Sequence, residues 1–146
     1  MGRQRMSAHG AHPLINRIAT ATNAHDLDAL TDCFDEKIES EHPAHPARSF
    51  TGRDQIRKNW AQIFGGVPDL RAELIRAASD GDTAWAEWEW TGMRRDGTPH
   101  HLRGVTVLGI SGDRASWVRL YMEPVEQGGA TIDAAVRSSV APGVRS

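Results

Sequence analysis

Four runs of alternating apolar and polar residues follow Pro68 and constrain the fold more than any other feature. Their sequences are DLRAELIRAA, TAWAEWEWTGM, HHLRGVTVLGI and RASWVRLYMEPV, and the short polar segments DGD, RRDGTP and SGD separate them. Alternation with a period of two is typical of half-buried β-strands, and glycine beside aspartate is typical of tight turns. The pattern therefore predicts a four-stranded antiparallel meander.

Helical periodicity precedes the meander. From Pro13 to about Asn23, apolar residues recur three or four positions apart, and Pro13 suits a first helical turn. Asp26 is a good N-cap for a second short helix, whose apolar side includes Cys33 and Phe34. These two segments predict a helical corner.

A strand and a third helix are predicted between this corner and the meander. In the segment KIESEH, acidic residues alternate with apolar or small ones, and the segment is expected to form a strand ending at Pro43. The segment TGRDQIRKNWAQIFGG carries an apolar stripe and stops at Gly65 and Gly66, while Thr51 and Asp54 have the spacing of a capping-box variant. Three helices on one curved antiparallel sheet predict an α+β domain, cone-shaped, with a pocket inside.

The chain organisation follows from where these patterns begin and end. Residues 1–11 are expected to be a flexible tail, residues 12–126 one folded domain, and residues 127–146 a second flexible tail with at most one weak turn of helix near Ile132 to Val136. A domain of this size has room for a real core, since it buries roughly 70% of its unfolded surface.

Composition excludes several classes of function. The formal net charge of −2 gives no basic face for nucleic acid, and no apolar run approaches the length of a membrane span. The single cysteine, Cys33, cannot form an internal disulfide and is expected in the core, which favours a reducing, cytoplasmic setting. No phosphate-binding glycine motif is present, so no nucleotide cofactor is expected.

Four segments between residues 13 and 126 resemble, in order, the nuclear transport factor 2-like superfamily, and in particular its SnoaL-like and ketosteroid-isomerase-like branch. They are NAHDLDAL, FDEKIESEHP, FTGRDQIRKNW and RLYMEPV. The resemblance implies a cystatin-like α+β barrel with a pocket for a small apolar molecule, and a homodimer formed through the outer face of the sheet. It does not decide the chemistry, because this superfamily hosts many activities.

The resemblance also implies site residues. In the isomerase pattern a base precedes the proline that ends the first strand, and here that residue is His42. An imidazole can take a proton from carbon next to a carbonyl, with an ordinary pKa close to neutrality. The tyrosine and aspartic acid that hold the enolate oxygen in the isomerases align with Ile18 and near Thr106, so steroid isomerisation is not expected. The resemblance also extends to the limonene-epoxide-hydrolase branch, which relies on a set of two aspartates and one arginine. Here Thr106 and Leu120 stand in place of the two carboxylates, and Arg103 is one residue away from the arginine position, which turns its side chain to the other face of the strand. Epoxide hydrolysis is therefore not expected either.

The remaining candidate site residues are selected by the face of the strand on which each side chain lies. Ile38, Ser40 and His42 share one face, which is expected to meet the cavity. Trp88 is expected to point inward and Trp85 outward, toward a partner subunit. The predicted catalytic set is His42, Thr106 and His100, where His100 is preferred over His101 by parity with Thr106; the predicted substrate-binding set is Asn59, Trp60, Trp88, Leu108 and Met122.

Two functions stay open at this point. In the first, the protein is a cofactor-independent isomerase, cyclase or lyase in which His42 is the general base for a ring-containing apolar substrate. In the second, the same fold is a non-catalytic ligand-binding or dimerisation module. A metal held by His42, His45 and Glu41 is not expected, because these residues lack the close histidine pairs of zinc sites.

Overall fold

A computed structural model describes residues 11–143 of the 146-residue chain. Residues 1–10, most of the predicted N-terminal tail, lie outside the described residues. In chain order the elements are α2 (Pro13–Asn23), α3 (Leu27–Asp32), β1 (Phe34–Glu41), the 3₁₀ helix η1 (Pro46–Arg48), β2 (Phe50–Thr51), α4 (Arg53–Gly66), β3 (Arg71–Asp80), β4 (Thr83–Met93), β5 (Pro99–Ser111), β6 (Arg114–Pro124) and α5 (Ile132–Val140).

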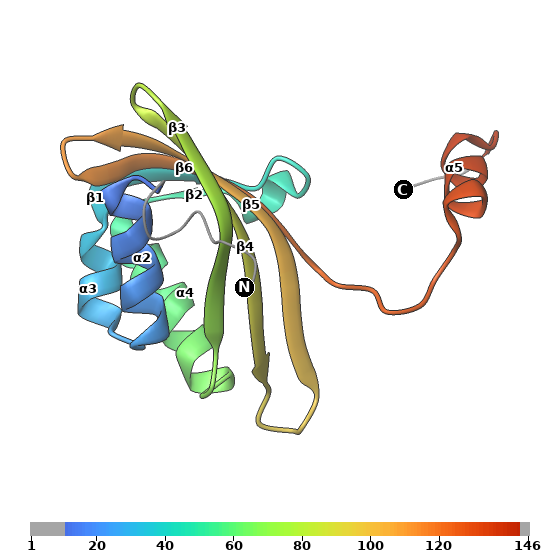
Figure 1. Ribbon diagram of the computed structural model, residues 1–146, viewed down its shortest axis with the longest axis horizontal. Helices are drawn as coiled ribbons and strands as arrows, with labels where there is room; N and C mark the ends of the chain where they lie inside the picture. Colours follow the sequence, from blue (N-terminus) through green and yellow to red (C-terminus); the bar gives the residue numbers. More distant parts are fainter. Residues whose placement is uncertain (1–10, 144–146) are drawn as a thin grey trace, which may run out of the picture.

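The strands form one curved six-stranded sheet in the order β2-β1-β6-β5-β4-β3 (Figure 1). The predicted four-stranded meander is confirmed, because β3, β4, β5 and β6 pair antiparallel in sequence order. The prediction of a wholly antiparallel sheet is wrong at one place, since β1 pairs parallel with β6. That pairing joins two segments that are far apart in the chain.

The first two helices begin as their sequences predict. In α2, the Nδ1 atom of His12 accepts the Leu14 N–H at 3.0 Å, and Pro13 occupies the first turn. In α3, the Asp26 carboxylate accepts the Ala29 N–H at 3.0 Å, which confirms Asp26 as the N-cap.

Two boundaries differ from the prediction. The helix α4 has Gly52 as its N-cap, with φ of 109° and no side-chain cap, so the predicted capping box of Thr51 and Asp54 does not form. A positive φ suits glycine, which explains why this position starts the helix. Phe34, expected on the second helix, instead begins β1, where it is buried.

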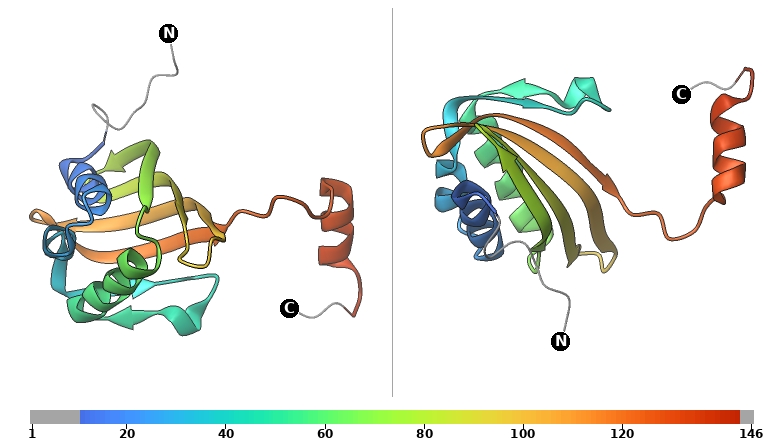
Figure 2. Two further views of the ribbon diagram at one scale, coloured as in Figure 1. Left: turned by 90° about the horizontal axis from the view of Figure 1, so that it is seen from below. Right: turned by 45° about the horizontal axis from the view of Figure 1, so that its top comes forward.

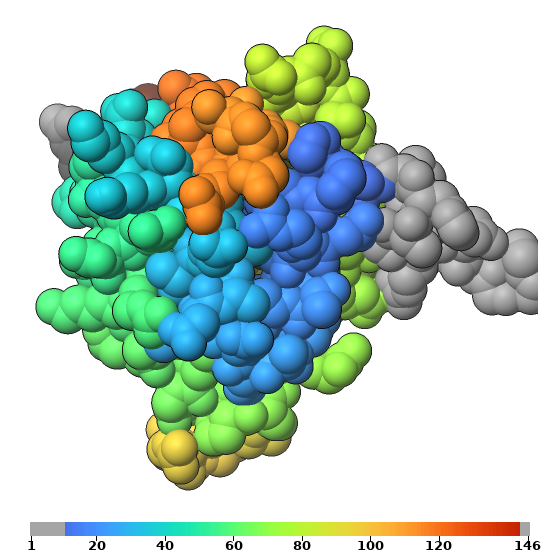
Figure 3. Space-filling model, turned by 90° about the vertical axis from the view of Figure 1, so that its left-hand side faces the viewer, coloured from blue at the N-terminus to red at the C-terminus, as the bar shows by residue number. Residues whose placement is uncertain are grey.

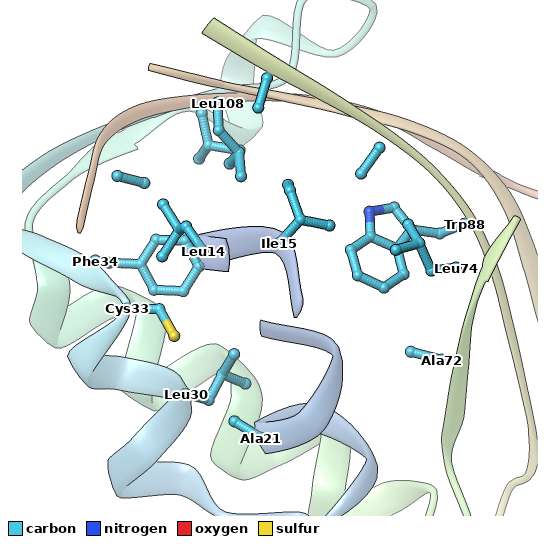
Figure 4. Packing of buried hydrophobic residues seen from close by; sticks show 14 of the residues in the cluster. Leu14, Ile15, Ala21, Leu30, Cys33, Phe34, Ala72, Leu74, Trp88 and Leu108 are labelled. Carbon is cyan, nitrogen blue, oxygen red and sulfur yellow. The ribbon is translucent and has the colours of Figure 1, made fainter. Parts of the chain in front are cut away.

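The core lies between the helices and the concave face of the sheet. Figure 2 shows the sheet bending around α2, and Figure 3 shows α2 and α3 closing one end of the molecule beside α4. Ile15 and Leu30 are fully buried, and Figure 4 shows Ile15 projecting from α2 toward Trp88 of β4. Cys33 is buried in the same cluster, as predicted, and burial raises the pKa of its thiol.

The C-terminal helix α5 stands apart from this domain (Figures 1 and 2). It is a complete helix of nine residues, longer than the single weak turn that the sequence predicts. Thr131 caps it, and its apolar residues Ile132, Val136 and Val140 are exposed. Among residues 11–143, no helix combines the length and apolar character that crossing a bilayer requires.

Candidate functional site

A cavity of about 240 Å³ lies between α4 and the concave face of the sheet. Residues of β1, β4, β5 and β6 form one wall, α4 forms the opposite wall, and the connection from β1 to β2 forms the rim. The lining residues are Ile18, Phe34, Ser40, His42, Arg48, Phe50, Ile56, Asn59, Trp60, Ile63, Trp90, Leu102, Thr106, Leu108, Val118, Leu120 and Met122.

Aromatic and aliphatic side chains make most of this surface. Trp60 on α4 meets Trp90 on β4 edge to face, with ring centroids 5.5 Å apart and planes at 71°. Trp60 also contacts Phe64, which stacks on His25. Edge-to-face packing fixes ring orientation, so the pocket has a rigid aromatic side suited to a flat apolar ligand.

His42 follows the last residue of β1 and lines the cavity. Its backbone is held by two hydrogen bonds: its N–H donates to Ser49 Oγ at 3.2 Å, and its carbonyl accepts from the His45 N–H at 2.8 Å. Its Nδ1 atom is buried and has no hydrogen-bond partner among residues 11–143. Burial lowers the pKa of His42, and the Arg48 charge lowers it further. These surroundings favour the neutral ring, and the Nδ1 atom is left without a hydrogen bond among the described residues.

Two polar side chains on other elements face the same cavity. Thr106 Oγ1 accepts the Trp88 indole N–H at 2.9 Å, which leaves its own hydroxyl hydrogen for another acceptor. Asn59 Oδ1 accepts from the Gln55 side chain at 2.8 Å, which leaves the Asn59 amide N–H groups for a ligand. The cavity therefore combines an imidazole with the hydrogen-bond donors of Thr106 and Asn59, and Ser40 and Arg48 are further polar residues of the lining.

Six of the predicted site residues line this cavity and two do not. Those that line it are His42, Thr106, Asn59, Trp60, Leu108 and Met122. Trp88 points inward and is buried, but it supports Thr106 and is absent from the cavity lining. His100 lies near the start of β5 and is not among the lining residues. Burial lowers its pKa, and the charge of Arg94 lowers it further.

Sequence reasoning missed several lining residues. Ser40 was placed on the correct face without a role, and it is 1% exposed. Trp90, two residues beyond Trp88 on the same face, takes the wall position expected of Trp88. Alternation along β4 would have found Trp90, whereas nothing in the local sequence marks Arg48, since its connection has no regular period.

The opposite face of the sheet carries charged and aromatic side chains. Glu89 accepts from His101 at 2.6 Å and from Arg103 at 3.1 Å, and the His101 hydrogen bond is the main cause that lowers the pKa of Glu89. Trp85 and Tyr121 lie on this face with 40% and 43% of their surface exposed. Within residues 11–143, no group of three or more metal-ligating side chains comes together.

Comparison with known proteins identifies the family. The model of the SnoaL-like domain matches residues 15–119, the greater part of the chain. The chain belongs to the SnoaL-like domain family. This confirms the predicted resemblance, and the observed α+β architecture is that of the family. No curated protein matches this SnoaL-like chain.

Several solved structures have the same fold as this SnoaL-like domain. A protein of ketosteroid isomerase-like fold from Catenulispora acidiphila, in complex with trimethylamine, has 20% identity and a TM-score of 0.66, covering 75% of this chain and 84% of that one. A candidate polyketide cyclase from Sinorhizobium meliloti has 21% identity and a TM-score of 0.60, with 77% and 94% covered. A cystatin-fold protein from Novosphingobium aromaticivorans has 23% identity and a TM-score of 0.60, with 73% and 92% covered. These likenesses establish the fold.

The protonation of His42 in this SnoaL-like domain is directly measurable. We expect the pKa of His42, followed by NMR of the ring protons, to lie below 6.5, its ordinary value. Replacing Arg48 by glutamine is expected to raise this pKa, because a nearby positive charge disfavours the imidazolium. Because the fold favours the neutral ring, the stability that His42 contributes is present above pH 6.5 and is lost as the pH falls through the lowered pKa.

A matched control is Arg137→Gln on α5, which makes the same charge change far from the cavity. It is expected to leave the His42 titration unchanged. A His42 pKa at or above 6.5 in the unaltered protein would contradict the assignment of a neutral buried ring.

Proposed function

We propose that this protein is a cofactor-independent enzyme of isomerase, cyclase or lyase type, acting on a small apolar molecule that contains a ring and a carbonyl group. We assign the activity to residues 12–126. The observation that carries the proposal is the His42 Nδ1 atom, which is buried beside an apolar cavity and has no partner within the described residues. A neutral imidazole in such surroundings is suited to remove a proton from carbon.

The proposed step begins with a C–H bond next to the substrate carbonyl. His42 takes the proton and becomes an imidazolium. The electron pair of the broken C–H bond forms a C=C bond, and the π pair of the carbonyl group moves to its oxygen, which gives an enolate. Thr106 and Asn59 each have an unused N–H or O–H donor and are proposed to hold that oxygen. Return of the proton from His42 to another carbon completes an isomerisation. His100 stays a prediction without a role in this step.

The ligand class follows from the wall. Trp60 and Trp90 supply a rigid aromatic surface, and Leu108 and Met122 on neighbouring strands add aliphatic contacts. A flat ring compound would bury its surface against them. The fold of the candidate polyketide cyclase from Sinorhizobium meliloti and the trimethylamine complex of the Catenulispora protein are consistent with a small-molecule site.

The test uses proton exchange in a model ketone, so it needs no natural substrate. 2-Tetralone is a flat, apolar bicyclic ketone, and exchange of its α-protons in D₂O is followed by ¹H NMR. We expect the protein to accelerate the exchange above the rate in buffer, with saturation as the ketone concentration rises. Ketone that binds without acceleration would contradict catalysis and leave binding in place.

A second candidate function is a non-catalytic ligand-binding module. It is favoured by the absence of any carboxylate from the lining residues and by Ile18 at the position of the isomerase tyrosine, where no hydrogen-bond donor is available. Native mass spectrometry of the purified protein, followed by denaturation and analysis of any released compound, separates the two functions. An apolar ligand that is recovered unaltered after long incubation supports the binding module.

A homodimer through the outer sheet face is also proposed. This face carries exposed Trp85 and Tyr121 together with charges of both signs, among them Glu87 and Arg119, so two copies turned toward each other can match acid to base. We expect Trp85→Glu combined with Tyr121→Glu to convert dimers to monomers in sedimentation analysis, because two carboxylates would enter an apolar interface.

The control for this prediction is Ile132→Glu, since Ile132 is also exposed but lies on α5, apart from the sheet (Figure 1). It is expected to leave the dimer intact. A monomeric unaltered protein, or a double variant that remains a dimer, would contradict the proposed interface.

A further inference from the structure

Arg48 is the only residue with a full charge among those that line the cavity. It lies at the end of η1, on the rim, close enough to His42 for its charge to act on that ring. No hydrogen bond or ion pair of its guanidinium is found within residues 11–143, whereas Arg57 and Arg103 pair with carboxylates. The cavity thus has a positive charge at its rim and no negative charge in its wall.

The connection that carries Arg48 is tied down at several points. The His45 ring contacts the Glu123 carboxylate at 2.9 Å, which joins this connection to the end of β6. The Arg48 N–H donates to the His45 carbonyl at 2.9 Å, and the Ser49 N–H donates to the Pro46 carbonyl at 3.0 Å. The backbone from which the guanidinium extends is therefore fixed at the rim.

An unpaired guanidinium beside an apolar cavity selects for a ligand of particular chemistry. A carboxylate can accept two parallel hydrogen bonds from one guanidinium, and the opposite charges of the two groups strengthen such a pair. Most of the rest of the wall, including Trp60 and Leu120, offers apolar contact to the body of the ligand. A ligand that has both a carboxylate and an apolar body can bind Arg48 at the rim and the apolar wall of the interior at the same time.

We infer that the ligand of this cavity is an apolar ring compound that carries a carboxylate or a similar anionic oxygen group, and that Arg48 binds that group at the rim. The inference rests on the proposed function for the existence of a ligand in the cavity. It goes beyond it by assigning Arg48 as the specificity-determining residue.

The experiment compares two ligands of nearly the same shape. 2-Naphthoate carries a carboxylate, and 2-naphthamide replaces it by a neutral amide; their dissociation constants are measured by calorimetry on the full chain. We expect the naphthoate to bind about tenfold more tightly, as a charge-assisted hydrogen bond predicts. Acetate, which has the charge without the ring, is expected to bind far more weakly than either.

Three variants make the assignment specific. Arg48→Gln is expected to make the dissociation constants of naphthoate and naphthamide about equal, by weakening the binding of naphthoate alone. Arg48→Lys is expected to retain part of the preference for naphthoate. Arg137→Gln on α5 is expected to retain all of it. Circular dichroism spectra of the variants verify that each is folded.

The outcomes separate this inference from the proposed function. Equal binding of both naphthalene compounds by the unaltered protein, or a preference that survives Arg48→Gln, overturns the role of Arg48 and leaves the pocket function standing. Acetate that binds as tightly as naphthoate overturns the apolar part of the ligand assignment. Failure of both naphthalene compounds to bind contradicts the pocket function itself and the inference with it.

Discussion

Replacing His42 by alanine is expected to lower the protein-catalysed exchange of 2-tetralone protons by at least about 100-fold, the usual contribution of a positioned general base. The Nδ1 atom that would accept the proton is buried at the cavity and unpartnered within the described residues, and alanine removes it without adding bulk. The measurement is the exchange rate by NMR at saturating ketone, with binding of the ketone measured separately.

The matched control replaces His100, the other histidine of the predicted catalytic set. His100→Ala is expected to leave the exchange rate unchanged, because His100 is not among the residues that line the cavity. Exchange that survives in His42→Ala, or that is lost in His100→Ala alone, would contradict His42 as the base.

Replacing Ile15 by alanine is expected to lower the free energy of unfolding by about 2–5 kcal/mol, the range for large-to-small changes in a core. Ile15 is 0% exposed and projects from α2 into the space under the sheet (Figure 4), so alanine leaves a void that neighbouring side chains cannot fill. Denaturant unfolding followed by circular dichroism measures the loss.

The same chemical change at Ile132 provides the control. Ile132 lies on α5 and is 76% exposed, so Ile132→Ala is expected to change the free energy of unfolding by no more than about 0.5 kcal/mol. Equal losses at Ile15 and Ile132 would show that α5 is packed as firmly as the core and would contradict the arrangement in which it stands apart.

Features of the fold that depend on neighbouring residues were predictable. The cap at Asp26 and the alternation of Ile38 and Ser40 inward with Glu39 outward are fixed by local hydrogen bonding and by the pleat of a strand. The turn at Gly81, with φ of 59°, is equally local. In each case one short segment contains all of the information.

Features that depend on distant partners were not predictable. Arg48 reaches the rim because His45 meets Glu123, 78 residues later in the chain, and no periodicity within the connection signals that contact. Trp88 has the right parity for the cavity but is engaged by Thr106 of the next strand, so Trp90 forms the wall instead. Contacts between distant segments decide the position of Arg48 and the choice of Trp90 over Trp88. The sequence of one segment does not contain that information.

The parallel pairing of β1 with β6 affects the order in which the molecule can form. Arg119 of β6 contacts Glu41 of β1, the residue immediately before His42, although the two residues lie 78 positions apart in the chain. During synthesis the residue proposed as the base leaves the ribosome long before the strand that aligns it, and contacts of such long range slow folding. A nascent chain that ends before β6 therefore has the histidine but not its alignment with β6, and the cavity lacks the wall that Val118, Leu120 and Met122 supply until this last strand is made.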